Sequence, residues 1–537
     1  MAPMNSLVHK YRLLVILPLG VYVYLLVQTA WCSDDAYITF RSIENFFHGY
    51  GPVFNVGERV QTFTHPLWFL LQTLANYVLD LWKENPLHNA QIYFLNIFMS
   101  MWLSLAAMLI LGFGIASSTR DAVLGIAILS GSKAFIDYST SGLENPLTHA
   151  ILVLFLWMVF SNRRNSPAHI FTLTLLAGLG GLNRLDALLL FLPTLVLLFL
   201  QNPDKQKTAG GILLGLSPLI AWEIFSILYY GTPFPNTAYA KINAEIPLAD
   251  MLRQGLWYFR NSLYLDPITL LVITAVILLG WKAADLHRKA VLTGVLLYLA
   301  YILYIGGDFM SGRYFSTPLL GAAAVLVSTE FKSAKSYALS LAAALILGLA
   351  PVYLIPERQA SFGSETGNWR VFRDEHGMTD ERHIYTRYGL GLMQTLSSGT
   401  ARTSDYSREN WIYEDIRPVH VELVGPLGMS AYGYGPNVHV IDVNALADPL
   451  MARLPLIDPS QWRIGHFRHM IPEGYIETLE SGENRITDPK IAEYYDNLTL
   501  VTRGGLWSRA RLVAIWKLNT GRYDHLLEDA SAYVDEG

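Results

Sequence analysis

The chain is organised around residues Ser33–Arg41, SDDAYITFR, which directly follow an apolar run over residues 12–31. Two adjacent carboxylates, Asp34 and Asp35, therefore emerge at the end of a segment that is long enough to cross a lipid bilayer. Charged groups at a bilayer surface carry a desolvation cost that a merely structural loop avoids. This pair is the leading candidate for the chemistry of the protein.

The composition excludes a water-soluble globular protein. Of the 537 residues, 52% are hydrophobic and only 15% are charged, and the mean hydropathy is +0.29, which predicts a polytopic membrane protein. The net charge of −5 gives no basic surplus for nucleic acid. The single cysteine, Cys32, excludes an intramolecular disulfide and a cysteine-cluster metal site. No Ala-x-Ala cleavage site follows the first apolar run, so we expect it to be retained as a helix.

The run over residues 66–81 decides the topology. Basic residues before the first apolar run favour a cytoplasmic N-terminus. If residues 66–81 do not cross, the basic loops near residues 120, 163, 205, 288 and 332 all fall in the cytoplasm, as the positive-inside rule prefers; if they cross, these loops move outside. We therefore expect residues 66–81 to fold against the outer face and residues 38–51 to form a short interfacial helix. This topology predicts about eleven membrane spans. They are 12–31, 91–115, 121–137, 145–160, 170–183, 187–200, 210–229, 267–281, 290–306, 314–330 and 337–355. The spans 170–183 and 187–200 are short.

The same topology brings the polar loops 137–145, 183–186, 231–266 and 306–314 to the outer side. Polar groups are scarce elsewhere in the hydrophobic region, so their convergence on one face indicates a functional site. Its candidate members for binding a donor phosphate or sugar are His65, Glu144, Arg184, Asp186, Lys241, Asp308 and Arg313.

Residues 1–356 are expected to form the membrane catalytic domain, with a first outer loop at about 32–90. After residue 356 charges become frequent and short strand-like runs such as Val438–Val443 appear, which predicts a mixed α/β soluble domain over residues 357–537 outside the cytoplasm. Tyr432, Tyr434, Trp462, Phe467 and Tyr475 are either stacking platforms for sugars or ordinary core and loop aromatics. Weaker candidates on the acceptor side are Tyr434, His439, Asp442 and Asp448.

These residue types suit transfer from a lipid phosphate. Asp34 or Asp35 can act as a general base toward an acceptor hydroxyl, with its neighbour orienting it or holding a divalent cation; a helix cap is the structural alternative. The nature of any metal stays unknown. Guanidinium groups match phosphate oxygens, which suits Arg184 and Arg313, although snorkelling at the interface explains such residues too. Glu144 either contacts the donor or a metal, or complements a helix dipole.

Several motifs resemble one known family. They are SDDA (Ser33–Ala36), FFHGYG (Phe46–Gly51), NVGERV (Asn55–Val60), THPLW (Thr64–Trp68), GLENPL (Gly142–Leu147), GDFMSGR (Gly307–Arg313), ADPL (Ala447–Leu450), RLP (Arg453–Pro455) and RIGHFR (Arg463–Arg468). Together they resemble the terminal arabinofuranosyltransferases of mycobacterial cell walls and their Gram-negative relatives. The resemblance covers nearly the whole chain.

This resemblance implies a GT-C glycosyltransferase of the bacterial plasma membrane. Such an enzyme transfers a sugar, with inversion, from a polyprenyl-phosphate carrier to an acceptor outside the cytoplasm. The implied donor is polyprenyl-phosphate arabinofuranose, and the acceptor is a cell-surface glycan or a pilin-like protein. An aspartate of the first outer loop is the base in such enzymes, which corresponds here to Asp34 or Asp35. His65 occupies a position near the donor phosphate in the wider superfamily, in a loop helix that does not span.

Two other classes of protein stay open at this point. A transporter or flippase for a lipid-linked sugar predicts two related halves and charges near the midplane of the bilayer, but here the charges gather at one face. A cell-envelope scaffold predicts that Asp34 and Asp35 are dispensable. A glycosidase mechanism is less favoured, because an energy-rich donor makes a covalent enzyme intermediate unnecessary.

Overall fold

The computed structural model describes residues 5–81, 91–161, 167–329, 333–354, 373–398, 411, 413–415 and 419–528. The chain forms two compact units, each of which is discontinuous in sequence. The helical unit comprises Met1–Ser33, Asn96–Leu219 and Leu248–Ala401, and the mixed unit comprises Asp34–Leu95, Ile220–Pro247 and Arg402–Gly537. The domain boundary predicted near residue 356 lies outside the described residues.

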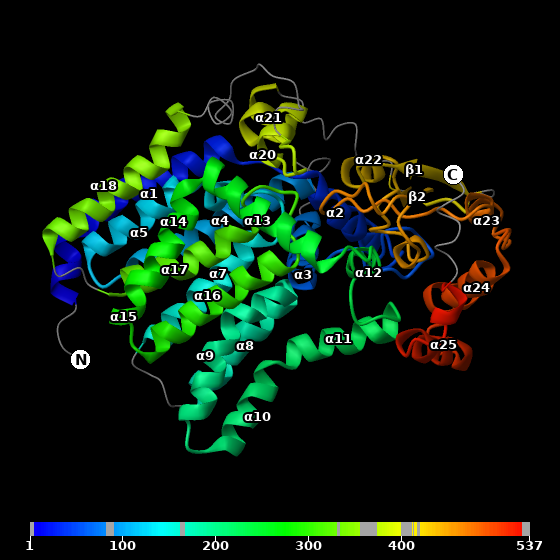
Figure 1. The fold of residues 1–537 in the computed structure, drawn as a ribbon, viewed down its shortest axis with the longest axis horizontal. Helices are drawn as coiled ribbons and strands as arrows, with labels where there is room; N and C mark the ends of the chain where they lie inside the picture. Colours follow the sequence, from blue (N-terminus) through cyan, green and yellow to red (C-terminus); the bar gives the residue numbers. More distant parts are fainter. Residues whose placement is uncertain are drawn as a thin grey trace. The chain divides into compact units, whose positions relative to one another are not determined.

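The helical unit is a bundle of apolar helices (Figure 1). Within it α5 packs against α1, α17 and α18, α7 packs against α8 and α17, and α16 packs against α9 and α17. Its elements are α1 (Asn5–Thr29), α4 (Gln91–Ile110), η2 (Leu111–Ile115), α5 (Thr119–Gly131), α6 (Lys133–Asp137), α7 (Asn145–Phe160), α8 (Pro167–Asn183), η3 (Leu185–Ala187), α9 (Leu188–Gln201), α10 (Lys205–Gly215), α13 (Leu248–Leu265), α14 (Pro267–Ala275), η4 (Val276–Gly280), α15 (Trp281–Ala283), α16 (Leu286–Tyr304), η5 (Arg313–Phe315), α17 (Ser316–Val327), α18 (Ala334–Leu354), α20 (Glu381–Tyr385), η8 (Thr386–Leu390) and α21 (Leu392–Ser398).

Helices occupy all eleven of the apolar runs that the sequence singles out. By length and composition, two of the described helices, Gln91–Ile115 and Leu286–Tyr304, can cross a membrane alone, and two bent pairs raise this number to four. One such pair, α13 with α14 and η4, is bent by 107°. The other apolar helices are shorter, so the count of eleven spans stays a prediction.

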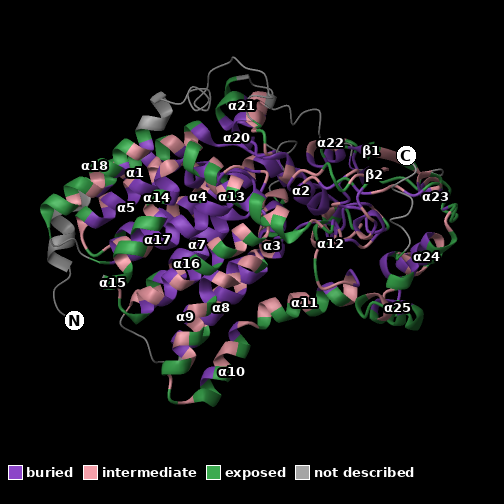
Figure 2. Ribbon diagram, viewed as in Figure 1, coloured by how far each residue is buried: buried purple, intermediate pink, exposed green. Residues whose placement is uncertain are grey.

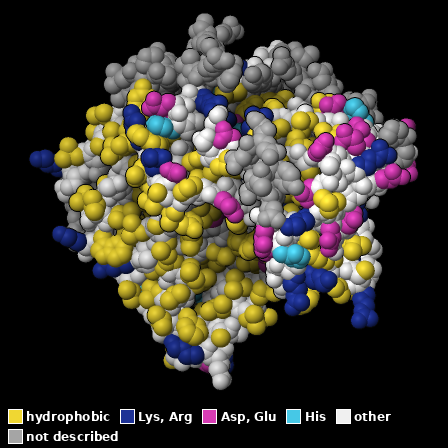
Figure 3. Space-filling model, turned by 45° about the vertical axis from the view of Figure 1, so that its right-hand side comes forward, with side chains coloured by type: hydrophobic (Ala, Val, Ile, Leu, Met, Phe, Trp, Pro, Cys, Tyr) yellow, Lys and Arg dark blue, Asp and Glu magenta, His cyan; other side chains and the backbone are white. Residues whose placement is uncertain are grey.

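The outer surface of the helical unit is rich in exposed apolar side chains. Leu17, Trp102 and Leu279 are 74%, 71% and 77% exposed, and hydrophobic side chains cover a broad face in Figure 3. Exposed apolar patches of this extent mark surfaces that contact a membrane or another protein, because exposing them to water is energetically unfavourable. Together with the apolar helices, this surface indicates a protein associated with a membrane.

The mixed unit combines short helices with a two-stranded parallel sheet. Strand β1 pairs with β2 in the register His420↔Val438 to Val424↔Asp442, and helix α22 connects the two strands. The elements are α2 (Asp34–Phe47), α3 (Pro66–Asp80), most of α11 (Ser217–Tyr229), α12 (Asn236–Ile242), β1 (His420–Val424), α22 (Gly428–Gly433), β2 (Val438–Asp442), η11 (Met451–Arg453), α23 (Tyr475–Ser481), α24 (Pro489–Arg503), α25 (Arg509–Asn519) and η12 (Asp524–Leu526).

These elements bear out three expectations from the sequence. The strand predicted at 438–443 is β2, and the helix expected over 66–81 is α3. The helix expected at 38–51 is α2, but it begins at Asp34 because both aspartates belong to its first turn, where acidic groups favour the helix dipole. Eleven of its residues are buried, so α2 packs inside the protein to a greater extent than an interfacial helix does.

The first outer loop and the C-terminal residues share one core in the mixed unit. Ile38 and Phe54 pack with Val424 and Val440. The buried guanidinium of Arg41 donates to three backbone carbonyls, those of Phe54, Ala431 and Val438. Since unpaired buried carbonyls and an unpaired buried cation are both costly, Arg41 ties α2 to the C-terminal segment.

The aromatic residues near the C-terminus divide between the two predicted roles. Tyr432, Phe467 and Tyr475 are buried, so they are core aromatics. Tyr434 is 43% exposed, and Trp462 stacks on Phe467 with a ring-centroid distance of 6.0 Å. Of the five, only Tyr434 presents an open ring of the kind that a stacking platform needs.

Candidate active site

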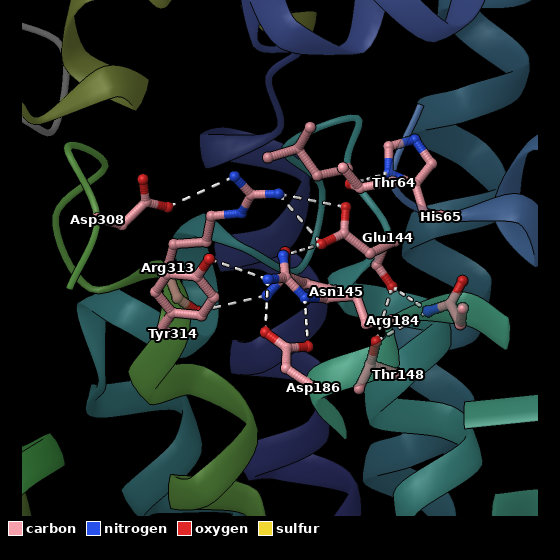
Figure 4. A network of polar contacts seen from close by, with 12 residues as sticks. Thr64, His65, Glu144, Asn145, Thr148, Arg184, Asp186, Asp308, Arg313 and Tyr314 are labelled. Atoms are coloured by element: carbon pink, nitrogen blue, oxygen red, sulfur yellow. Dashed lines mark hydrogen bonds and ion pairs between the residues drawn. The ribbon is translucent and has the colours of Figure 1, made fainter. Parts of the chain in front are cut away.

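Two arginines and a buried glutamate form the centre of a polar network in the helical unit (Figure 4). The carboxylate of Glu144 accepts from Arg184 Nη1 at 2.7 Å and from Arg313 Nη2 at 3.1 Å. Arg184 also forms a two-pronged pair with Asp186, at 2.9 and 2.7 Å. Arg313 Nη1 lies 3.4 Å from Asp308. The structure thus brings together five of the residues that the sequence predicts to converge.

Two largely buried helices of the bundle have Glu144 and Arg313 at their N-terminal ends. Glu144 is the N-cap of α7, and Arg313 begins the turn η5 that leads into α17. Most residues of both helices are buried (Figure 2). Their first-turn N–H groups carry partial positive charge, so both helix ends favour an anion.

Glycines position the loop that carries Asp308 and Arg313. Gly307 has φ +76°, and a Cβ there would lie 2.4 Å from the ring of Tyr258. Gly312 has φ +78°, and a Cβ there would lie 3.0 Å from Ala134. Glycine suits both positions because it adopts positive φ freely and has no Cβ, so the loop backbone can approach Tyr258 and Ala134 closely.

The charges of the centre nearly cancel. Arg184 and Arg313 contribute two positive charges, and Glu144, Asp186 and Asp308 contribute three negative ones. Arg313 is only 9% exposed, and its buried Nε has no hydrogen-bond partner among the described residues. A buried donor without a partner is costly, so this N–H is available to an acceptor atom of a ligand.

Amide and hydroxyl side chains that the sequence did not single out support the centre. Asn183 Nδ2 donates to the Glu144 carbonyl at 3.0 Å and to Thr148 at 2.8 Å. Arg184 donates to the Tyr314 hydroxyl at 3.0 Å and lies over the ring of Tyr314 at 4.8 Å. The only sequence signal for Asn183 and Tyr314 was their position in the polar loops, and Thr148 lies within α7.

A second polar group, also not predicted, lies in the helical unit. Asp137 pairs with Lys133 and, at 2.6 Å, with Arg382. Lys133 also contacts Asp380 at 3.0 Å. Burial disfavours the charged form of Asp380, but Lys133 and Arg382 outweigh this effect and lower the pKa of its carboxyl. Sequence reasoning missed this group because Lys133 and Asp137 lie more than 240 positions away from Asp380 and Arg382.

In the mixed unit Asp34 is held firmly at the start of α2. Its two carboxylate oxygens accept from the backbone N–H groups of Gly428, at 3.0 Å, and Met429, at 2.8 Å. Burial raises the pKa of the Asp34 carboxyl, while these N–H groups act in the opposite direction. Asp35 is more exposed than Asp34. Asp34 therefore has the helix-cap role that the sequence offered as the alternative, and the helix that it caps is α22 of the C-terminal segment.

Two predicted phosphate partners also belong to the mixed unit. His65 is the N-cap of α3, and its Nε2 lies 2.8 Å from the hydroxyl of Thr39. Lys241 lies in the last turn of α12 and is exposed.

The acceptor-side candidates are mostly engaged in bonds within the mixed unit. Asp442 accepts from the N–H groups of residues 446 and 447, at 2.9 and 3.0 Å. Asp448 accepts from two N–H groups and from the hydroxyl of Tyr475 at 2.7 Å. Burial raises the pKa of Asp442 to about 6. Burial lowers the pKa of His439 to about 3, so this imidazole stays neutral. These bonds give Asp442 and Asp448 a structural role in holding the turn after β2.

Among the described residues no group of three or more His, Cys, Asp and Glu side chains is arranged to hold a metal ion.

Comparison with curated proteins identifies the chain as a glycosyltransferase. No protein-family model matches it. An enzyme of Mycobacterium tuberculosis is 26% identical over 538 residues, covering 84% of this chain and 82% of the relative. An enzyme of Corynebacterium glutamicum is 27% identical over 524 residues, covering 82% of this chain and 73% of the relative.

Both relatives are terminal β-(1→2)-arabinofuranosyltransferases. The chain thus resembles this group of enzymes along most of its length, as its motifs predict. Because both relatives are enzymes that transfer a sugar, the comparison favours an enzyme over a transporter or a scaffold.

Proposed function

We propose that this membrane glycosyltransferase transfers arabinofuranose from a polyprenyl-phosphate donor to a glycan or protein acceptor outside the cytoplasm. The names of the two relatives support the sugar. The apolar surface of the helical unit supports a donor that is dissolved in the bilayer. The proposed topology has about eleven spans, a cytoplasmic N-terminus and an outer soluble domain.

The observation that carries the donor assignment is a pair of arginines, the buried Arg313 and the partly buried Arg184, that share the carboxylate of Glu144. Arg184 and Arg313 are fixed by carboxylates, so their guanidinium planes do not reorganise when a substrate binds. The Nε of Arg313, which has no hydrogen-bond partner in the part of the chain that the structure describes, can donate to a phosphate oxygen. As the bond from the sugar to the phosphate breaks, negative charge develops on the leaving phosphate, and fixed donors in a dry site stabilise it.

We assign the base to Asp34 within the Asp34–Asp35 pair. Two backbone N–H groups orient its carboxylate, and an ionised carboxylate has about four lone-pair sites, so proton-accepting capacity remains. Burial raises the pKa of Asp34 toward the range in which a base works at neutral pH. The acceptor hydroxyl loses its proton to Asp34 while its oxygen attacks the anomeric carbon and the lipid phosphate leaves.

The first experiment is transfer of radiolabelled arabinofuranose from synthetic polyprenyl-phosphate arabinofuranose by the purified protein, with glycan and pilin-like acceptors. Asp34→Asn is expected to lower kcat by about 10²–10⁴-fold, the usual contribution of a general base. Asp35→Asn is expected to retain more activity than Asp34→Asn. The exposed Asp496→Asn in α24 is the matched control for removal of a carboxylate in the same unit.

Full transfer by Asp34→Asn would contradict the assignment of the base. Loss of transfer in Asp35→Asn alone would move the base to Asp35. A single displacement inverts the anomeric centre, so the NMR spectrum of the product tests the step itself; retention would indicate a covalent intermediate. No transfer by the wild type to any acceptor would overturn the proposed donor sugar.

A further inference from the structure

A cavity of about 400 Å³ lies beside helix α13 in the helical unit. One wall is the α13 face with Trp257, Asn261 and Tyr264, and the other is the segment 374–380. This size falls within the range of small-molecule sites, about 300–1,000 Å³. None of the residues singled out from the sequence lines it.

The lining combines aromatic surface with planar hydrogen-bonding groups. Trp257 stacks on the ring of His376 at 4.0 Å, which fixes the indole in place. Tyr264 is 56% exposed and has no ring contact within the described structure. Asn261 donates to Asp374 at 2.9 Å, and Glu375 is mostly solvent-exposed. Aromatic faces beside carboxylates and amides suit a ligand that has both C–H faces and hydroxyl groups.

The charge of the lining disfavours an anionic ligand. Asp374, Glu375 and Asp380 face a single lining cation, Arg260. Lys133 pairs with Asp380 at 3.0 Å, so one of these negative charges is compensated from outside the cavity. The lining offers a phosphate one arginine, Arg260, which is 65% exposed and lies 4.0 Å from Glu375, whereas the arginine centre brings two guanidinium groups together. A neutral sugar needs no cation, and the acids of the lining do not repel it.

The cavity is connected to the arginine centre by short hydrogen bonds. Ser311 donates to Asn261 at 2.8 Å, and Ser311 lies between Asp308 and Arg313 in the chain. One turn of α13 away, Tyr258 donates to the Met310 carbonyl at 3.0 Å and accepts from the N–H of Tyr314 at 3.2 Å. The same helix therefore fixes both the loop of the arginine centre and the wall of the cavity.

We propose that this cavity is a glycan subsite, which binds a neutral sugar unit of the acceptor that is not the one receiving the new sugar. This inference rests on the proposed function for the identity of the sugar. Tyr264 supplies the stacking face, and Glu375 accepts from sugar hydroxyls. Acceptors that are long enough to reach the cavity gain affinity that a single-sugar acceptor does not have.

The test uses the full-length protein in nanodiscs and neutral arabinofuranosyl oligosaccharides of one to six units as methyl glycosides. Calorimetric titration without donor measures binding, and transfer measures KM and kcat for each length. Tyr264→Ala is expected to weaken binding of the longer oligosaccharides and to raise their KM by about tenfold, which is typical of losing an aromatic contact. The same variant should leave the KM of the single-sugar acceptor and the kcat at saturation unchanged.

Tyr304→Ala, at another exposed tyrosine of the helical unit that does not line the cavity, should leave both KM values unchanged. Glu375→Gln provides an independent lining variant at an exposed position and should weaken the same oligosaccharides several-fold. Binding should hardly change between low and high salt, because the ligand is neutral.

The subsite is overturned if Tyr264→Ala and Glu375→Gln bind all lengths as the wild type does, if they affect the single-sugar acceptor equally, or if salt abolishes the binding. Oligosaccharide binding that depends on Tyr264 without any transfer would support the subsite and contradict the proposed function. Transfer with normal KM values in both variants would support the proposed function and contradict the subsite.

Discussion

Replacing Glu144 with glutamine tests whether this buried carboxylate holds the arginine centre together. Glu144 is 0% exposed, and it accepts from both Arg184 and Arg313. Glutamine keeps the shape but removes the charge, and its NH₂ group cannot accept from a guanidinium. The charge sum of the centre changes from −1 to 0, and each arginine keeps only one carboxylate, Asp186 or Asp308.

The magnitude follows from the burial of the network. Breaking a buried ion pair costs about 3–5 kcal/mol when the remaining charge has no other partner. Because each arginine keeps one carboxylate here, we expect a loss at the lower end, about 3 kcal/mol. For a unit of this size that corresponds to a decrease of about 5 °C in the unfolding midpoint. A displacement of Arg313 by about 1 Å from the position that stabilises the leaving phosphate lowers transfer by about 10²-fold.

Thermal unfolding in detergent and the transfer assay measure the two effects. The matched control is Glu483→Gln, because Glu483 is 77% exposed and pairs with Arg485 at 3.3 Å; a surface pair of this kind contributes at most about 1 kcal/mol. The double variant Glu144→Gln/Arg184→Gln should lose less stability than the sum of the single variants, since the two side chains interact directly. A midpoint and a transfer rate of Glu144→Gln equal to those of the wild type would refute the reasoning.

Two further predictions concern the mixed unit. Burial raises the pKa of Glu58 from 4.5 to about 7, against the opposing charge of Arg503; its contribution to stability is complete below pH 4.5 and decreases by about 3 kcal/mol as the pH rises to about 7. Glu58→Gln should therefore flatten the dependence of the unfolding midpoint on pH between 4.5 and 7, and an unchanged slope would count against this account. A Cβ at Gly428 would lie 1.8 Å from the backbone oxygen of Asp34, whereas Gly425 has no atom within 4 Å. Gly428→Ala should therefore lose about 3 kcal/mol of stability together with transfer, Gly425→Ala should lose neither, and equal midpoints for the two variants would exclude the clash.

The sequence alone determined the class of the protein and most of its helices. Long apolar runs without charges can bury themselves only as helices in a membrane, so α4, α7 and α16 follow from composition. The scarcity of charges in those runs made the polar loops stand out. For that reason the pairing of Asp308 with Arg313 and the clustering of Glu144, Arg184 and Asp186 were predictable.

Only the tertiary structure decided which partners the polar groups have. Asp34 accepts from residues 428 and 429, and Arg41 donates to residues 431 and 438. No local pattern records contacts between positions almost 400 residues apart, because backbone N–H and carbonyl groups are the same at every residue. The sequence grouped Arg184 and Arg313 with three acids, but only the fold shows that Glu144 contacts both arginines. A buried charge requires a counter-charge, but which acid supplies it depends on the packing of the helices.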